Sequence, residues 1–150
     1  MSEEREQPRI PLHLAMDNPE PMYRQIESQL RDLILGGHLP PGTKLPTIRA
    51  LAVDLGCSAI TTTRAYQDLE TEGFIRTRVG MGTVVAEMPE EKLSAYRREA
   101  VEGAVEEALE AGLRVGLERE ELRKIVEGIL EEKLQDAAHT KAATGGGGTS

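Results

Sequence analysis

Hydroxyl and guanidinium side chains recur through the stretch from Thr47 to Arg78, where they bring hydrogen-bond donors and positive charge together. Ser58, Thr61 and Thr62 can donate hydrogen bonds to phosphate oxygens or to polar base edges, and Arg64, one helical turn further, can reach a phosphate. Such groups bind anionic and polar ligands rather than carry out a covalent reaction. The stretch is therefore a candidate binding surface, which the surrounding elements must hold in place.

Catalytic and metal-binding chemistry finds no support elsewhere in the chain. His13, His38 and His139 are too scattered for metal-ligand spacing, and no Ser/His/Asp set or carboxylate pair stands in a context that supports catalysis. The single cysteine, Cys57, excludes an intrachain disulfide and fits a reducing cytosol. A redox sensor is the alternative to an inert, packed thiol. We expect no enzyme activity, no cofactor and no metal.

The binding stretch has the pattern of a helix-turn-helix. Thr47 is a candidate N-cap, apolar residues recur at helical spacing as far as Leu55, and Gly56 can close this first helix. After a tight turn, Ser58 can cap a second helix, which Gly73 ends and whose core-facing positions are Thr62, Ala65, Tyr66 and Leu69. Two short helices joined by a glycine-containing turn form a helix-turn-helix, and the start of its second helix is the part that reaches base edges in the DNA major groove.

A β-hairpin pattern follows the second helix. Arg76 and Arg78 are polar residues at alternate positions of a first strand. A glycine-rich tip, Gly80–Gly82, and the β-branched run Thr83–Val85 follow them. This hairpin is the wing of a winged helix-turn-helix. We therefore expect a mainly α fold with a small β-hairpin wing, in which a winged helix-turn-helix domain is followed by two amphipathic helices.

Charge is distributed unevenly along the chain, whose formal net charge is −8. From Glu20 to Glu87 there are 7 basic and 8 acidic residues, whereas from Met88 to Gln135 there are 8 basic and 13 acidic residues. The acidity is concentrated outside the binding stretch, so a local basic face is compatible with the composition. No apolar run reaches membrane-spanning length, and the first residues, MSEEREQPR, are charged where a signal peptide would need an apolar core. We therefore expect a cytoplasmic protein that does not engage a membrane.

The 150 residues divide into four predicted regions. Residues 1–18 form a flexible N-terminal arm or, because apolar residues alternate at 10, 12 and 14, an edge strand or a segment laid along the body. The winged helix-turn-helix DNA-binding domain spans 19–87 and opens with a helix whose apolar stripe includes Tyr23. Residues 88–135 form a two-helix dimerisation region, and 136–150, which contain GGGG, form a disordered tail.

The two C-terminal helices each carry an apolar stripe that so small a unit cannot bury alone. Pro89 to Leu113 has the period of one helix, and a second helix follows a turn at 114–117. Packing against another copy of the chain would bury both stripes, so we expect a homodimer. The residues expected at its interface are Leu93, Tyr96, Ala100, Ala104, Leu109, Leu122, Ile125, Val126 and Ile129.

A long ordered pattern covers the chain from about Pro19 to Glu87. The sequence from Ile34 to Ala52 follows I-x-x-G-x-L-x-P-G-x-x-L-P-x-x-R-x-L-A, and the sequence from Tyr66 to Gly73 follows Y-x-x-L-E-x-E-G. This stretch resembles the N-terminal winged-helix domain of the GntR family of bacterial transcription regulators. The short two-helix tail is similar to that of the YtrA-like subgroup, so we expect neither the effector-binding domain nor the aminotransferase-like domain of other branches.

The resemblance implies that Arg49 contacts DNA from the first helix of the motif and that the wing approaches the backbone or minor groove through Arg78 and its glycine-rich tip. Methyl groups of Ala59 and Ile60 could touch a thymine methyl. Because Ala59 stands where some branches place a base-reading arginine, we expect phosphate and shape contacts to carry more of the binding. The residues expected to contact DNA are Thr47, Arg49, Ser58, Ala59, Ile60, Thr61, Thr62, Arg64, Arg78, Gly80 and Gly82.

Two functions follow from these patterns. The first is a dimeric, sequence-specific DNA-binding transcriptional regulator, a repressor at an inverted-repeat operator of double-stranded DNA, with a small-molecule effector left open. The alternative is a protein-protein interaction module with a vestigial DNA-binding surface. Individual residues have structural alternatives as well, because Arg49 could pair with Asp54 or Glu70 on the surface and the wing glycines could serve turn geometry alone.

Overall fold

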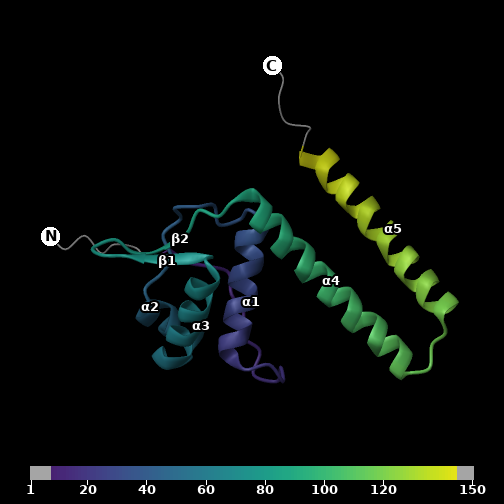
Figure 1. Ribbon diagram of the computed structural model, residues 1–150, viewed down its shortest axis with the longest axis horizontal. Helices are drawn as coiled ribbons and strands as arrows, with labels where there is room; N and C mark the ends of the chain where they lie inside the picture. Colours follow the sequence, from purple (N-terminus) through teal and green to yellow (C-terminus); the bar gives the residue numbers. More distant parts are fainter. Residues whose placement is uncertain (1–7, 145–150) are drawn as a thin grey trace, which may run out of the picture. The chain divides into compact units, whose positions relative to one another are not determined.

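The computed structural model describes residues 8–144, which form five helices and one two-stranded sheet. The elements in chain order are α1 (Met22–Leu35), α2 (Ile48–Leu55), α3 (Ala59–Glu72), β1 (Ile75–Arg78), β2 (Gly82–Val85), α4 (Glu90–Arg114) and α5 (Arg119–Thr144) (Figure 1). They separate into two compact units, unit 1 (Met1–Arg97) and unit 2 (Arg98–Ser150). The predicted fold class, a winged helix-turn-helix followed by two helices, is confirmed.

The core of unit 1 lies where α1 and α3 pack against each other and against the start of the hairpin. Ile26 and Leu30 of α1, Ala65 and Leu69 of α3, and Phe74 just before β1 are fully buried. Within each helix the two buried residues are four positions apart, which puts them on one face of that helix. The shorter α2 packs on α3, so the helix-turn-helix is one part of a continuous core.

The two helices of the motif begin and end where the sequence predicts. The hydroxyl groups of Thr47 and Ser58 each accept a hydrogen bond at 3.1 Å from the backbone N–H three residues later, and they cap α2 and α3 respectively. Gly56 and Gly73 end these helices with φ angles of 67° and 90°. A β-carbon disfavours this left-handed conformation, so glycine is suited to both ends.

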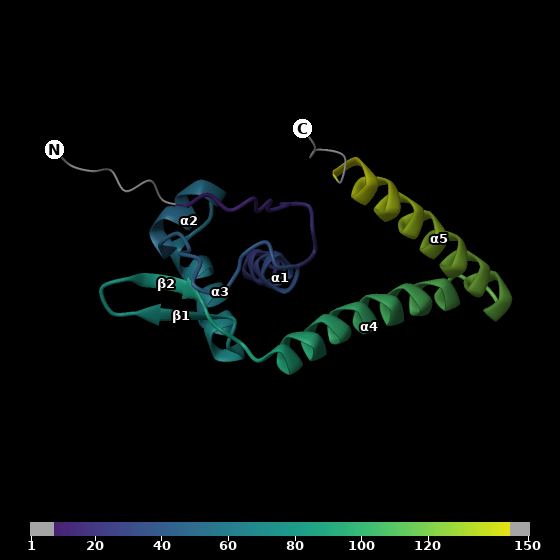
Figure 2. The same cartoon turned by 90° about the horizontal axis from the view of Figure 1, so that it is seen from above.

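The wing is an antiparallel hairpin in which Ile75 lies opposite Val85 and Arg78 lies opposite Gly82. Ile75 and Val85 are buried at the base of the hairpin, which anchors it to the core. Lys44 forms an additional bridge with β2, so the loop before α2 is tied to the wing. Figure 2 shows the turn of the hairpin extending beyond α2 and α3.

The segment before α1 lies along that helix. The side-chain amide of Gln29 bonds to both backbone groups of His13, at 2.9 and 2.8 Å, and the amide of Gln25 bonds in the same way to Ala15, at 2.8 and 3.1 Å. An amide offers one acceptor and two donors, so it can satisfy an extended backbone as a neighbouring strand would. Leu12 is buried beside these contacts. The arm from residue 8 onward is thus laid along the body, while 1–7 lie outside the described residues.

The first turns of α4 belong to unit 1. Leu93 and Tyr96 are partly buried against its core. The Tyr96 ring centroid lies 4.8 Å from that of Phe74, and the Tyr96 hydroxyl donates a hydrogen bond to the carbonyl of Glu72 at 3.3 Å. Leu93 and Tyr96 therefore pack within the chain instead of forming the free dimer face that their helical period predicted, and unit 1 extends beyond the predicted boundary at residue 87.

Unit 2 contains the rest of α4 and all of α5. Near the turn between them the Leu122 side chain lies directly against Gly112, and from there the two helices diverge (Figure 2). The prediction of a disordered tail is wrong for 136–144, because α5 continues to Thr144. Alanines at 137, 138, 142 and 143 favour helix in this stretch. The glycine-rich end at 145–150 lies outside the described residues.

Candidate nucleic-acid interface

The exposed start of α3 carries side chains that suit DNA base edges. Ser58, Ala59 and Ile60 are exposed, and Ile60 is 82% exposed although its side chain is apolar. The Ser58 hydroxyl lies 2.9 Å from the hydroxyl of Thr61, which is half-buried. This end of the helix offers methyl groups beside a hydroxyl pair, a combination that fits thymine methyls and the acceptors of bases or phosphates.

Thr62 does not lie on this surface, contrary to the sequence prediction. Its side chain is fully buried, and its hydroxyl donates a hydrogen bond to the Ser58 carbonyl at 3.4 Å. The partly buried Cys57 sulfur lies 3.4 Å from the same hydroxyl. Thr62 precedes Ala65 and Leu69 at helical spacing, so it shares their core-facing side of α3. Its role is to pack the turn against the helix.

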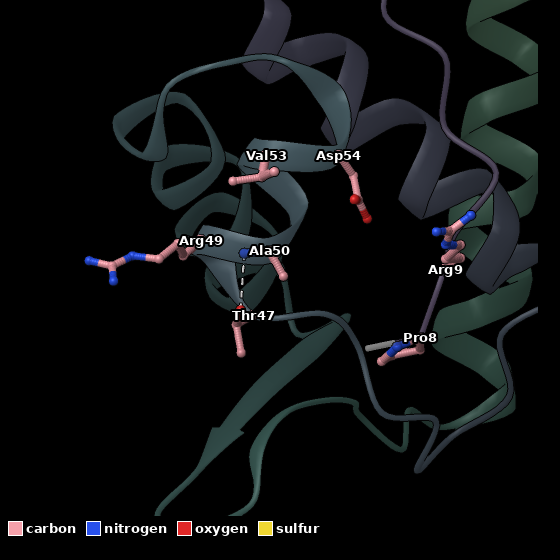
Figure 3. A pocket seen from close by; sticks show the side chains of 7 residues that line it. All are labelled: Pro8, Arg9, Thr47, Arg49, Ala50, Val53 and Asp54. Carbon is pink, nitrogen blue, oxygen red and sulfur yellow. Dashed lines mark hydrogen bonds between the residues drawn. The ribbon is translucent and has the colours of Figure 1, made fainter. Parts of the chain in front are cut away.

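Arg49 projects from the first turn of α2 on the side away from Asp54 (Figure 3). Its side chain is exposed, and within residues 8–144 its guanidinium forms no ion pair with Asp54, Glu70 or any other carboxylate. The Glu70 carboxylate instead accepts a hydrogen bond from the Thr77 N–H at 3.0 Å. The surface salt bridge considered from the sequence is therefore absent from this described part of the chain, and the charge of Arg49 is available to an anionic ligand.

An open surface hollow of about 780 Å³ lies beside α2. Thr47, Arg49 and Asp54 line it from the helix, and Pro8 and Arg9 line it from the segment before α1 (Figure 3). The hollow thus brings a second arginine, Arg9, to the Asp54 side of α2, whereas the Arg49 side chain projects the other way (Figure 3). Nothing in the sequence pattern predicted this approach, because it depends on how the N-terminal segment is laid across unit 1.

The wing exposes arginine side chains on its first strand and glycine backbone at its tip. Arg76 and Arg78 of β1 are exposed. Gly80 and Gly82 have φ angles of 79° and 75°, and a β-carbon at either position would meet no neighbouring atom within 4 Å. Backbone conformation therefore requires glycine at the tip, whereas crowding does not. The open tip remains able to approach another molecule closely.

Arg64 lies on the exposed side of α3, one turn after Ile60, and stacks on an aromatic ring from α1. Its guanidinium carbon is 3.8 Å from the centroid of the Tyr23 ring. The guanidinium of Arg24 is 5.9 Å from the same centroid. The sequence pattern placed Tyr23 only in the apolar stripe of its helix, and no local signal pairs it with Arg64, since the contact depends on α1 packing against α3.

A buried carboxylic acid lies where α1 meets α3. Glu27 is 5% exposed, and its Oε1 atom has no hydrogen-bond partner among residues 8–144. Burial, together with a hydrogen bond to Asp68 and the like charge of that residue, raises the pKa of Glu27 to about 7. Arg31 opposes this shift only in part, because its guanidinium also pairs with Glu72 at 2.8 Å. We therefore expect the stability of the packing between α1 and α3 to depend on the protonation of Glu27.

Unit 2 exposes most of the apolar residues predicted for dimerisation. Ile125, Val126 and Ile129 of α5 are 47%, 44% and 52% exposed, although all are large and apolar. On α4 and α5 the remaining predicted residues range from exposed to half-buried; these are Ala100, Ala104, Leu109 and Leu122. Because the two helices diverge from their turn, they do not cover each other's stripes.

Two further classes of site were sought in the same part of the chain. Residues 8–144 contain no group of histidine, cysteine and carboxylate side chains arranged to hold a metal ion. Nor does any helix in that range combine the length and the apolar character needed to cross a membrane. The candidate site is therefore the surface formed by α2, α3 and the wing.

Comparison with known proteins shows what the region that carries this surface is similar to. A profile described as "Bacterial regulatory proteins, gntR family" matches residues 22–85, from the start of α1 to the end of β2. The HTH-type transcriptional regulator YhcF of Bacillus subtilis, described as uncharacterized, is 36% identical over 97 residues, which cover 60% of this chain and 80% of YhcF.

Two further relatives extend the comparison. The HTH-type transcriptional repressor YtrA of Bacillus subtilis is 43% identical over 67 residues, which cover 45% of this chain and 52% of YtrA. The chain thus spans about half the length of that relative. The solved structure of a GntR family transcriptional regulator from Listeria monocytogenes has a TM-score of 0.65 and 26% identity, covering 75% of this chain and 97% of its own. The profile match and the similarity along most of YhcF show that the chain belongs to the GntR family of bacterial regulatory proteins.

Proposed function

We propose that this protein is a dimeric, sequence-specific DNA-binding transcriptional regulator that acts as a repressor at an inverted-repeat operator. The observation that carries the proposal is the exposed start of α3 beside Arg49, whose guanidinium has no ion-pair partner within residues 8–144. An unpaired arginine next to exposed hydroxyl and methyl groups can bind phosphate and base edges together.

The proposed contacts fall into two kinds. Arg49, Arg64 and Arg78 would bind phosphates and set the position of the domain on the duplex, whereas Ser58 and Ile60 would approach base edges. Because alanine at position 59 offers no donor to guanine, sequence-dependent DNA shape should carry part of the specificity. The residues proposed to contact DNA are Thr47, Arg49, Ser58, Ala59, Ile60, Thr61, Arg64, Arg78, Gly80 and Gly82.

The homodimer is proposed on the apolar face of unit 2. Val105 of α4 and Ile125, Val126 and Ile129 of α5 are between 43% and 52% exposed, because the two helices diverge and, within residues 8–144, leave them only partly covered. The α4–α5 pair of a second copy would bury both apolar stripes, in keeping with the resemblance of this tail to that of the YtrA-like subgroup. Two recognition helices related by a two-fold axis would then read half-sites about 10 base pairs, or a multiple of that, apart.

The alternative is a protein-protein interaction module whose DNA-binding surface is vestigial. The same exposed apolar face favours it, since a different protein could also cover that face. The two functions differ in what the unpaired Arg49 does: it is essential in the regulator and dispensable in the module.

The experiment that tests the proposal begins with selection of duplexes from a random library by the full chain. Binding of the selected duplex and of a scrambled duplex is then measured by fluorescence anisotropy over a salt series. Arg49→Ala is compared with Arg98→Ala, a charge-matched control in unit 2 whose guanidinium pairs with Glu102 at 2.6 Å.

A regulator is expected to enrich an inverted repeat and to bind it with an affinity that falls steeply with salt, at a log-log slope of about −0.9 per phosphate contacted. Arg49→Ala should weaken binding by about tenfold or more, whereas Arg98→Ala should leave it unchanged. A selection that enriches nothing, together with no binding of any duplex at low salt, would favour the interaction module.

A further inference from the structure

Two guanidinium groups meet at one aromatic ring beside the recognition helix. The Arg64 guanidinium carbon lies 3.8 Å from the Tyr23 ring centroid, which is the distance of close stacking. The Arg24 guanidinium carbon lies 5.9 Å from the same centroid, within the range of a cation-π contact.

These positive charges are not neutralised by a close carboxylate. Within residues 8–144 neither Arg24 nor Arg64 forms an ion pair, and both side chains are exposed. Glu20 and Glu27 are the acidic groups that act on Arg24. Glu27 is buried, and burial together with the nearby Asp68 raises its pKa to about 7, so part of its negative charge is lost at neutral pH.

The ring also holds the Arg64 guanidinium in a useful orientation. Stacking engages the flat face of a guanidinium, while its N–H groups lie in the plane and remain free to donate. A planar fork of free donors matches the oxygens of a phosphate. Because the side chain is already ordered by the stack, less rotamer entropy is lost when the ligand binds.

The site lies at the edge of the surface proposed to read DNA. Arg64 is one helical turn after Ile60 on the exposed side of α3, and Tyr23 is the second residue of α1, which packs along α3. The tyrosine therefore comes from outside the helix-turn-helix and acts on a residue inside it.

We infer that Tyr23 is a positioning residue that holds Arg64, together with Arg24, as a paired-arginine site for one phosphodiester group of the DNA backbone at the edge of the recognition helix. This inference rests on the proposed function. It assigns a role in DNA binding to two residues of α1, Tyr23 and Arg24, in addition to the contacts proposed above.

The test is a double-mutant cycle in DNA affinity, measured by fluorescence anisotropy with the full chain and the selected duplex over a salt series. The variants are Arg64→Ala, Tyr23→Leu, their combination, and the conservative Tyr23→Phe. Arg98→Ala in unit 2 is the charge-matched control. Far-ultraviolet circular dichroism and the urea midpoint of each variant report whether it is folded.

Arg64→Ala is expected to weaken binding by about tenfold and to reduce the salt slope by about one unit, as loss of one phosphate contact requires. Tyr23→Leu should weaken binding by about threefold without any change in charge. The double variant should bind like Arg64→Ala alone, since the tyrosine acts through that arginine. Tyr23→Phe, which keeps the ring, should bind within about twofold of the parent.

A merely structural tyrosine would give additive losses in the double variant, and that result would overturn the inference, as would unchanged affinity in Tyr23→Leu. If Tyr23→Leu does not fold, Arg64→Lys, at an exposed position, tests the same point. Lysine keeps the charge but cannot stack as a planar guanidinium does, so about threefold weaker binding is expected. Unchanged binding would overturn the inference. Absence of DNA binding by the parent protein would overturn the proposed function as well, so the two failures are distinguishable.

Discussion

Replacing Glu27 with glutamine is expected to make the folded protein more stable at neutral and alkaline pH. The carboxyl group is buried between α1 and α3, its Oε1 atom has no partner within residues 8–144, and the like charge of Asp68 lies beside it. Ionising such a group in the folded state costs free energy that ionisation in the unfolded chain does not. Glutamine keeps the shape of the neutral acid and removes that cost.

The sign and size follow from the raised pKa of Glu27. Folding shifts this pKa from 4.5 to about 7, so the penalty is absent below the lower value, grows between the two, and is complete above the higher value. The full shift corresponds to at most about 3 kcal/mol above pH 7, and at pH 5 less than about 1 kcal/mol of it has developed. The stability advantage of Glu27→Gln should therefore grow by about 2 kcal/mol between pH 5 and pH 8.

The assay is urea denaturation followed by circular dichroism at several pH values between 5 and 8. Protein concentration is held constant, because dimerisation would make the midpoint concentration-dependent. Other carboxylates titrate in the same range, so the informative quantity is the difference between variant and parent at each pH. Glu87→Gln, at an exposed position near the end of the wing, is the matched control and should show no such growth.

The reasoning is refuted if the difference between Glu27→Gln and the parent stays constant from pH 5 to pH 8. It is equally refuted if the variant becomes relatively less stable as the pH rises. The second result would mean that the ionised carboxylate is stabilised in the fold, for example by Arg31 or Arg24, more strongly than burial penalises it.

Three other substitutions test separate features. Thr62→Val keeps the buried volume but removes the hydroxyl, so it should lower the free energy of unfolding by about 1 kcal/mol and leave the DNA affinity of the folded protein unchanged in anisotropy. Gly56→Ala, at a φ of 67°, should cost about 1 kcal/mol in urea denaturation, and a neutral result would show that the turn can relax. Ile129→Glu should convert a dimer to a monomer in light scattering after size-exclusion chromatography, whereas Glu131→Gln, an exposed polar position of α5, should leave the dimer intact; a dimeric Ile129→Glu would move the interface elsewhere.

Local chemistry explains why much of the fold was predictable. The caps at Thr47 and Ser58 and the left-handed ends at Gly56 and Gly73 depend on residues within a few positions of one another. The wing likewise depends on β-branched residues beside a glycine-rich tip, whose glycines have positive φ.

Several predictions that depended on which face of a helix contacts the core were wrong. The apolar period of its helix already places Thr62 on the face of Ala65, and the structure buries it there, so its assignment as a DNA contact beside its hydroxyl neighbours is wrong. Leu93 and Tyr96 were grouped with the stripe of α4, but Phe74 and the end of α3 offer them a nearer apolar surface. The glycines of the tail predicted disorder from residue 136, but its alanines extend α5 to Thr144.

The helix-turn-helix, the wing, the C-terminal helices and the exposed positions of Ser58, Ile60 and Arg49 are predictable from the sequence, because capping, turn geometry and apolar period are properties of neighbouring residues. The stacking of Tyr23 on Arg64 and the burial of Glu27 beside Asp68 are seen only in the folded structure. Both pairs join α1 to α3, and side chains distant in the chain meet only through the way two helices pack, which no local pattern specifies.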